Sequence, residues 1–152
     1  MFANTATRVS SNTDAHINEC IRRRTEKSIA KYAQLGREAI RRRLFALDKE
    51  WDIERCVEIM SPTFSLAGLT LGILGSKKWL IIPLVVQGFF LQHAIQGWCP
   101  PIPVLRRLGV RTAEEINYER NALKAIRGDY QEIPPMSNND GVAHQALEAA
   151  AR

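Results

Sequence analysis

The chain has 152 residues, a length that suits a single domain. Its formal net charge of +5 and mean hydropathy of −0.20 look like those of a soluble protein. The charged residues are unevenly distributed along the chain. Residues 59–105 carry no charged side chain except Lys77 and Lys78, although 24% of all residues are charged. Basic and acidic residues are interleaved elsewhere, which argues against nucleic acid as a partner and favours anionic lipid.

The region before the apolar stretch predicts a flexible tail over residues 1–13 and a cytoplasmic helical region over residues 14–58. The tail is small, polar and without a period. A stripe of apolar residues then predicts a first helix that ends at Gly36. A second helix from Arg37 has a short coiled-coil-like seam and is expected to continue toward the membrane. The two stripes consist of Ile17, Ile21, Ile29, Tyr32 and Leu35, and of Ile40, Leu44, Leu47 and Trp51.

Residues 59–99 predict a transmembrane hairpin with spans at 59–76 and 79–98. In the first span, Ser61 is expected to cap the helix and Pro62 to occupy its first position. Four small residues follow on one face, and in lipid such a face lets another helix approach closely. We therefore predict a helix–helix interface at Ser65, Gly68, Gly72 and Gly75.

The second span runs from Trp79 to Trp98, a distance of about 28 Å along a helix, which nearly matches the bilayer core. Both indoles are expected at the headgroup level. Polar residues near the end of this span predict interhelical hydrogen bonds from Gln92, His93 and Gln96.

The turn between the spans is so short that they must be antiparallel. Its two lysines are outnumbered by the basic residues that flank the hairpin, which predicts a multi-pass protein with both termini in the cytoplasm. These flanking residues are Arg41, Arg42, Arg43, Lys49 and Arg55 before the hairpin, and Arg106, Arg107, Arg111 and Arg120 after it. A soluble helical adaptor, in which the apolar runs form a buried core, is the alternative, but the apolar faces of the flanking helices are narrow.

Residues 100–128 predict an interfacial turn followed by a cytoplasmic helix. Pro100, Pro101 and Pro103 turn the chain, and Arg106 and Arg107 are expected at the membrane interface, before Gly109. Residues 112–115 form a capping box, Thr-x-x-Glu, which begins a helix. Its inward residues are expected to be Ile116, Leu123 and Ile126, and residues 129–152 to form a second flexible tail in which a helix would be marginal at best.

The stretch GWCPPIPVLRRLG resembles the signature of the YgaP-like family of small bacterial inner-membrane hairpins. The resemblance covers residues 62–112 and is carried by Gly97, Trp98, Cys99, Pro100, Leu108 and Gly109. It implies a stand-alone, multi-pass protein of the bacterial inner membrane that forms a homodimer through its hairpin. In some members a rhodanese sulfurtransferase domain is attached, but this sequence lacks the strand–helix alternation that such a domain needs.

Cys99 invites two chemical hypotheses. Haem ligation together with His93 is disfavoured, because side chains six residues apart point to different faces of a helix. A sulfur- or redox-handling role remains an alternative, although a cysteine at a helix C-terminus gains no help toward a thiolate. With three cysteines and no CxxC spacing, reduced thiols are expected. The sequence therefore predicts an all-α, two-span hairpin with cytoplasmic amphipathic helices, no enzymatic activity, no cofactor and no metal, acting as an interaction or assembly module with the bilayer and a homodimer or larger complex.

Overall fold

The computed structural model describes residues 4–131 and 140–151, and these are helical without any β-strand, so the all-α prediction is confirmed. The described chain divides into two compact units. The first contains the residues up to Arg22 together with Trp51–Glu115, and the second contains Arg23–Glu50 and the residues from Ile116 onward. The elements, in order, are α1 (Arg8–Ser11), α2 (Ala15–Leu35), α3 (Arg37–Leu47), α4 (Ile53–Leu74), the 3₁₀ turn η1 (Lys77–Leu80), α5 (Ile81–Gln96), α6 (Ile102–Leu108), α7 (Ala113–Arg127) and α8 (Asp140–Ala151).

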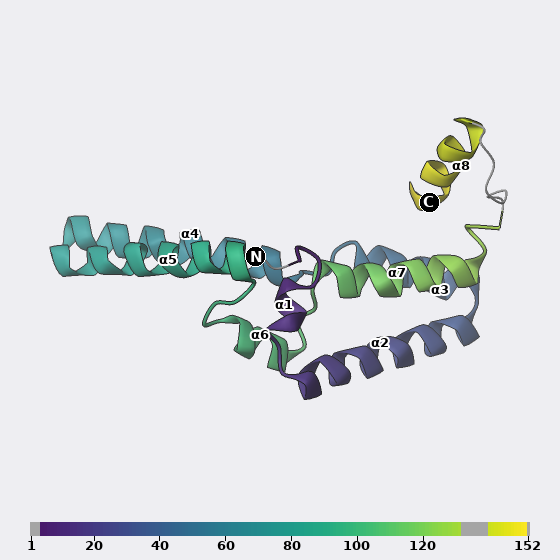
Figure 1. Cartoon of the computed structure of the whole chain (residues 1–152), viewed down its shortest axis with the longest axis horizontal. Coiled ribbons are helices and arrows are strands. Elements are labelled where there is room, and N and C mark those ends of the chain that lie inside the picture. Colours follow the sequence, from purple (N-terminus) through teal and green to yellow (C-terminus); the bar gives the residue numbers. More distant parts are fainter. Residues whose placement is uncertain (1–3, 132–139, 152) are drawn as a thin grey trace. The chain divides into compact units, whose positions relative to one another are not determined.

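The first unit is dominated by a helical hairpin, in which α4 lies alongside η1 and α5 (Figure 1). The 22 residues of α4 extend about 33 Å. Two helical segments, α4 and Lys77–Gln96, are long and apolar enough to cross a membrane. Only 28% of the apolar window of α4 and 6% of that of Lys77–Gln96 are buried, unlike the core helix of a soluble protein.

The first arm of the hairpin begins earlier than the sequence predicted. Asp52 is its N-cap, and the carboxylate accepts a 2.7 Å hydrogen bond from the backbone N–H of Arg55. Pro62 lies inside the helix, so the predicted cap at Ser61 is wrong. A proline inside a helix removes one backbone hydrogen bond and crowds the carbonyl four residues earlier, and the helix Ile53–Leu74 accommodates both effects at Pro62.

The base of the hairpin, meaning the end opposite η1, is closed by a small apolar core. Its buried members come from four segments and are Val9, Ile53, Val57, Cys99 and Ile102. Residues 8–11 are therefore helical and Val9 is only 1% exposed, which corrects the flexible tail predicted for residues 1–13. A single apolar side chain in a polar segment gives no periodic signal, so this docking was not visible in the sequence.

The second unit has its own core between α3 and α7. The buried residues are Ile40, Leu44, Leu47, Ile116 and Leu123, with Ile29 and Tyr32 of α2 packed against them. The predicted seam is correct at its first three positions. Trp51 is half exposed because α3 ends at Leu47, so the predicted continuation into the next helix is wrong. Ile126, predicted inward, is 49% exposed.

The core of the second unit also buries a carboxylate that sequence reasoning missed. Glu119 of α7 is fully buried and accepts hydrogen bonds from Arg43 Nε at 2.8 Å and Arg43 Nη2 at 3.0 Å. Ser28 Oγ donates a third bond at 2.6 Å. In the tail predicted for residues 129–152, Asp140–Ala151 form α8, and residues 132–139 lie outside the described part of the chain.

Candidate functional site: the seam and base of the hairpin

The seam of the hairpin, meaning the face of α4 that packs against α5 and η1, is lined by small residues. Ser61, Ser65, Gly68 and Gly72 are all buried. A Cβ atom on Gly68 would lie 2.6 Å from Pro83 Cδ, and one on Gly72 would lie 2.8 Å from Leu80 Cγ. These distances are shorter than a carbon–carbon contact. At Gly68 the clash is with the rigid ring of Pro83 and with Ile82 Cβ, so glycine is required there for the close approach of the arms, whereas at Gly72 the flexible side chain of Leu80 could move aside.

Of the four small residues predicted at this interface, Ser65, Gly68 and Gly72 are buried on the face of α4 that packs against α5 and η1. Gly75 is the exception, because it is exposed and follows the last residue of α4. A Cβ there would meet only the carbonyl of Leu71 in its own helix, so Gly75 makes no contact with the other arm.

Gln87 supplies the polar contact across the seam. Its Nε2 donates to Ser65 Oγ at 2.9 Å and to Ser61 Oγ at 3.2 Å, and we call these two residues the seam serines. The sequence analysis missed Gln87, although it lies four residues after Pro83 and so shares a face with it.

The polar residues predicted at the interface have different positions. His93 is buried, Gln92 is half-buried, and Gln96 is exposed, which corrects its predicted place in the helix–helix interface. The backbone carbonyl of Gln96, rather than its side chain, accepts a hydrogen bond of 2.8 Å from Asn12 Nδ2.

Gly97 ends α5 and is required there for two reasons. Its φ of +76° is left-handed, and its N–H donates to the carbonyl of His93 at 2.8 Å, which closes the last turn. A Cβ at this position would lie 2.6 Å from both the carbonyl oxygen and Cγ of Arg8. The glycine of the Gly-x-Cys-Pro motif thus lets α1 pack directly on the end of the second arm.

The other motif residues shape the turn into α6. Trp98 is half-buried and Pro100 is exposed. The carbonyl of Cys99 accepts a hydrogen bond of 3.1 Å from the backbone N–H of Ile102, the first residue of α6. Gly109 ends α6 with a φ of +90°. The predicted capping box is present at the next helix, since Thr112 N–H donates to Glu115 Oε2 at 2.9 Å and Glu115 N–H to Thr112 Oγ1 at 3.2 Å.

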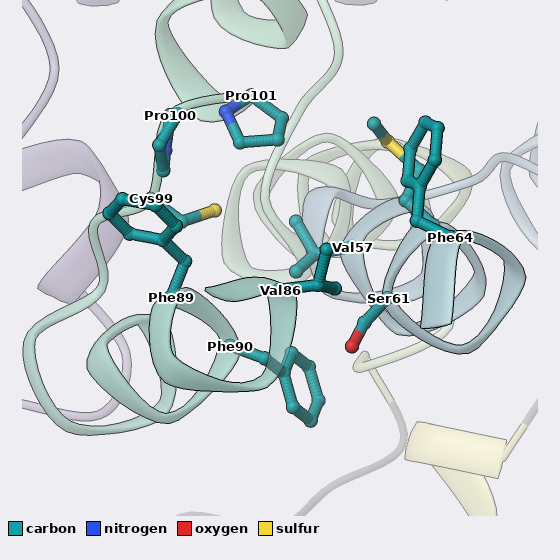
Figure 2. Close-up of a pocket in the computed structure, with 10 residues that line it drawn as sticks. Val57, Ser61, Phe64, Val86, Phe89, Phe90, Cys99, Pro100 and Pro101 are labelled. Atoms are coloured by element: carbon teal, nitrogen blue, oxygen red, sulfur yellow. The ribbon is translucent and has the colours of Figure 1, made fainter. Parts of the chain in front are cut away.

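Cys99 faces an apolar pocket of about 230 Å³ between the two arms and the Cys-Pro-Pro turn. Figure 2 shows its sulfur directed toward the space enclosed by the lining side chains. The lining residues are Val57, Met60, Ser61, Phe64, Val86, Phe89, Phe90, Cys99, Pro100 and Pro101. The volume is smaller than the roughly 300–1,000 Å³ of pockets for drug-sized ligands.

The surroundings of Cys99 do not activate its thiol. The side chain is 2% exposed, and burial raises its pKa, with a smaller opposing effect from the hydrogen bond to Ile102. A reactive cysteine needs a lowered pKa and access to its substrate. The arrangement of Cys99 is that of a packing residue.

Arg106, which was predicted at the membrane interface, has a fully buried side chain. Its guanidinium makes two short hydrogen bonds to Glu115, at 2.6 and 2.7 Å, and further bonds to the carbonyl of Val110 and to Asn18 Oδ1. The pair explains why the buried charge is tolerated, since the carboxylate neutralises it. Arg107, its neighbour, is exposed, as is Trp79.

Within residues 4–131 and 140–151, no group of three or more His, Cys, Asp or Glu side chains is arranged to hold a metal ion. Comparison with known proteins gives no relative from which a role could be transferred. No family model matches the chain, and neither a curated protein nor a solved structure does.

Proposed function

We propose that this protein is a non-enzymatic anchoring or assembly module of the bacterial inner membrane. The hairpin of α4, η1 and α5 crosses the bilayer twice, and the helices of the second unit lie in the cytoplasm, where they contact a protein partner or anionic lipid. The Gly97–Pro100 motif, which resembles that of the YgaP-like hairpins, closes the base of the hairpin at the cytoplasmic side.

The observation that carries this proposal is the apolar outer surface of the hairpin. Large apolar side chains on both arms remain exposed over lengths that suit the roughly 30 Å hydrocarbon core. Soluble proteins rarely expose a continuous apolar surface of this extent. The exposed set comprises Phe64, Leu66, Leu69, Leu71, Ile73, Leu74, Trp79, Leu80, Ile81, Leu84, Val85, Phe89, Leu91 and Ile95.

The seam also supports a membrane setting. Gly68 and Gly72 allow close backbone approach, and Gln87 bonds the seam serines, so dispersion and hydrogen bonds hold the arms together. These are the forces that remain available between helices in lipid, where burial of apolar surface gives no driving force.

A homodimer or larger complex would have to use the outer faces of the hairpin. The small-residue face of α4 already packs on η1 and α5, so a helix from another copy of the chain has no access to this face. The sulfur-handling alternative gains no support from the burial of Cys99.

The test is alkaline carbonate extraction of membranes, followed by labelling of single cysteines from each side with a membrane-impermeant thiol reagent. Cys20 is the cytoplasmic probe, in a chain in which Cys56 and Cys99 are replaced by Ser. A matched variant replaces Cys20 by Ser as well and carries Ser76→Cys in the turn.

We expect the chain to stay in the membrane pellet. Cys20 should react only when the cytoplasmic face is accessible, and the cysteine at position 76 only from the opposite face. Release into the carbonate supernatant would refute the membrane assignment, and labelling of both positions from one side would refute the two spans.

A further inference from the structure

The apolar pocket beside Cys99 is built from one face of each arm of the hairpin. The lining residues of α4, from Val57 to Phe64, follow the spacing of a single helical face, and those of α5, from Val86 to Phe90, do the same. The Cys-Pro-Pro turn forms the remaining wall (Figure 2). All three parts belong to the first compact unit, so the pocket is complete within that unit.

The walls of the pocket suit an apolar occupant. None of these described lining residues is charged, and Ser61 is the one among them with a hydroxyl group. That hydroxyl oxygen accepts a 3.2 Å hydrogen bond from Gln87 Nε2 in the seam. A water molecule needs about two to four polar partners to stay in a cavity. The pocket offers no such set of partners to water or to a polar ligand, and it therefore suits hydrocarbon.

The size of the pocket matches a segment of an acyl chain. Its volume is about 230 Å³, and a water-sized group such as a methylene takes up about 30 Å³, which leaves room for about seven or eight carbon atoms. The wall formed by α4 extends about 10 Å from Val57 to Phe64, close to the length of such a segment when it is extended. A dry apolar cavity of about 150 Å³ already binds benzene, so a pocket of this kind is sufficient to hold hydrocarbon.

The pocket is continuous with the apolar outer surface of the hairpin. Phe64 and Phe89 line the pocket and also belong to the exposed apolar set, and Pro100 at the turn is exposed as well. Val57 and Cys99 are buried lining residues. A hydrocarbon chain can therefore enter from the outer surface, whereas a molecule that stays on that surface does not touch Val57 or Cys99.

We propose that this pocket is a binding site for one lipid acyl chain, which enters from the bilayer and runs between the two arms past Cys99. The inference rests on the proposed membrane function, because the hairpin meets lipid only if it spans the bilayer. In that setting the Cys-Pro-Pro turn lies near the headgroups, and the pocket extends from there toward the middle of the bilayer, as a phospholipid chain does. Since no lining residue is charged, the site recognises the chain and not the headgroup. The bound chain gives the pocket walls the contacts that an empty space would deny them.

The experiment places a photoreactive lipid beside the full chain and measures which thiol it modifies. The protein is reconstituted in phosphatidylcholine vesicles that contain a trace of phosphatidylcholine with a diazirine in the first half of one acyl chain. In one protein Cys99 is the single cysteine, because Cys20 and Cys56 are replaced by Ser. In the other, all three cysteines are replaced by Ser, and Leu84→Cys places a thiol at a position of α5 that is 70% exposed. Mass spectrometry quantifies insertion at each thiol.

We expect insertion at both thiols, although the Cys99 side chain is buried. Val86→Trp in the Cys99 protein fills the pocket and should reduce insertion at Cys99 at least about tenfold, because the indole and the acyl chain compete for one space. The matched control is Val85→Trp, at the neighbouring exposed position that does not line the pocket, and it should leave insertion unchanged. Met60→Trp and its exposed neighbour Ile59→Trp repeat the comparison on α4.

Each outcome distinguishes the pocket from the membrane assignment. Insertion at position 84 without insertion at Cys99 would mean that the hairpin lies in lipid with an empty pocket, and would refute this inference alone. Insertion at neither thiol would refute the membrane function and this inference with it. Equal insertion at Cys99 in a pocket-filling variant and its control would mean that lipid reaches the thiol by another route, which also overturns the proposal. Circular dichroism shows whether the helices of each variant are intact, and the two pairs on different arms provide independent measurements.

Discussion

A methyl group added at Gly68 is the most direct test of how the two arms of the hairpin are held together. Its Cβ would lie 2.6 Å from Pro83 Cδ and 2.9 Å from Ile82 Cβ, whereas carbon atoms prefer about 3.5–4.0 Å. The arms must therefore separate by about 1 Å or strain their side chains. Overpacking of this kind costs about 1–3 kcal/mol.

Gly88 of α5 offers a matched control. A Cβ built there has nothing within 4 Å, so Gly88→Ala adds the same methyl group to a helix without a clash. Both substitutions gain up to about 1 kcal/mol of helix propensity, and this gain cancels when the two variants are compared. We expect Gly68→Ala to be less stable than Gly88→Ala by about 1–3 kcal/mol.

The assay is reversible unfolding of the purified chain in mild detergent by titration with a denaturing detergent, followed by circular dichroism. The parent and the two variants are compared under identical conditions. If Gly68→Ala and Gly88→Ala shift the transition by the same amount, the seam is not closely packed and the reasoning is refuted.

Three further predictions follow from named contacts. Gln87→Leu leaves the seam serines without their shared donor and should cost about 0.6–2 kcal/mol in the same titration, whereas Gln96→Leu, at an exposed position, should cost less. Glu119→Ala leaves Arg43 partly buried without its main carboxylate, and we expect a loss of about 3 kcal/mol by thermal unfolding, the lower end of the usual range because Arg43 is 22% exposed and Glu50 lies 3.9 Å away. Since burial raises the pKa of Cys99, its alkylation by iodoacetamide should be far slower than that of a free thiol at neutral pH and should still be rising well above about pH 8.5; a plateau near neutral pH would contradict this.

The local elements could be predicted because their signals lie within a few residues. A stripe at helical spacing predicted α2, and Gly36 at its end has the left-handed φ of +84° that favours glycine. The Thr112–Glu115 capping box forms as predicted. Each depends on backbone geometry over one or two turns, which short-range sequence alone specifies.

The charged and capping residues of the base could not be predicted in the same way. Arg106 was expected at a lipid surface and Ser61 at a helix start, because nothing near them in sequence indicates the buried Glu115 pair or the earlier cap at Asp52. Glu119 in the second unit is a similar case, since its partners Arg43 and Ser28 come from distant segments.

The sequence by itself determined that the chain is all-helical and that its centre is a pair of long apolar helices joined by a short turn. Residue composition and the spacing of apolar residues are sufficient to predict these helices, because helical hydrogen bonds are local and an apolar surface is recognised by its residue types. Only the tertiary structure decided which small residues face the other arm, that Gln87 bonds across the seam, and that Val9 of α1 joins the core at the base of the hairpin. Those choices depend on distances of a few tenths of an ångström between residues far apart in the chain, and no pattern along one segment carries that information.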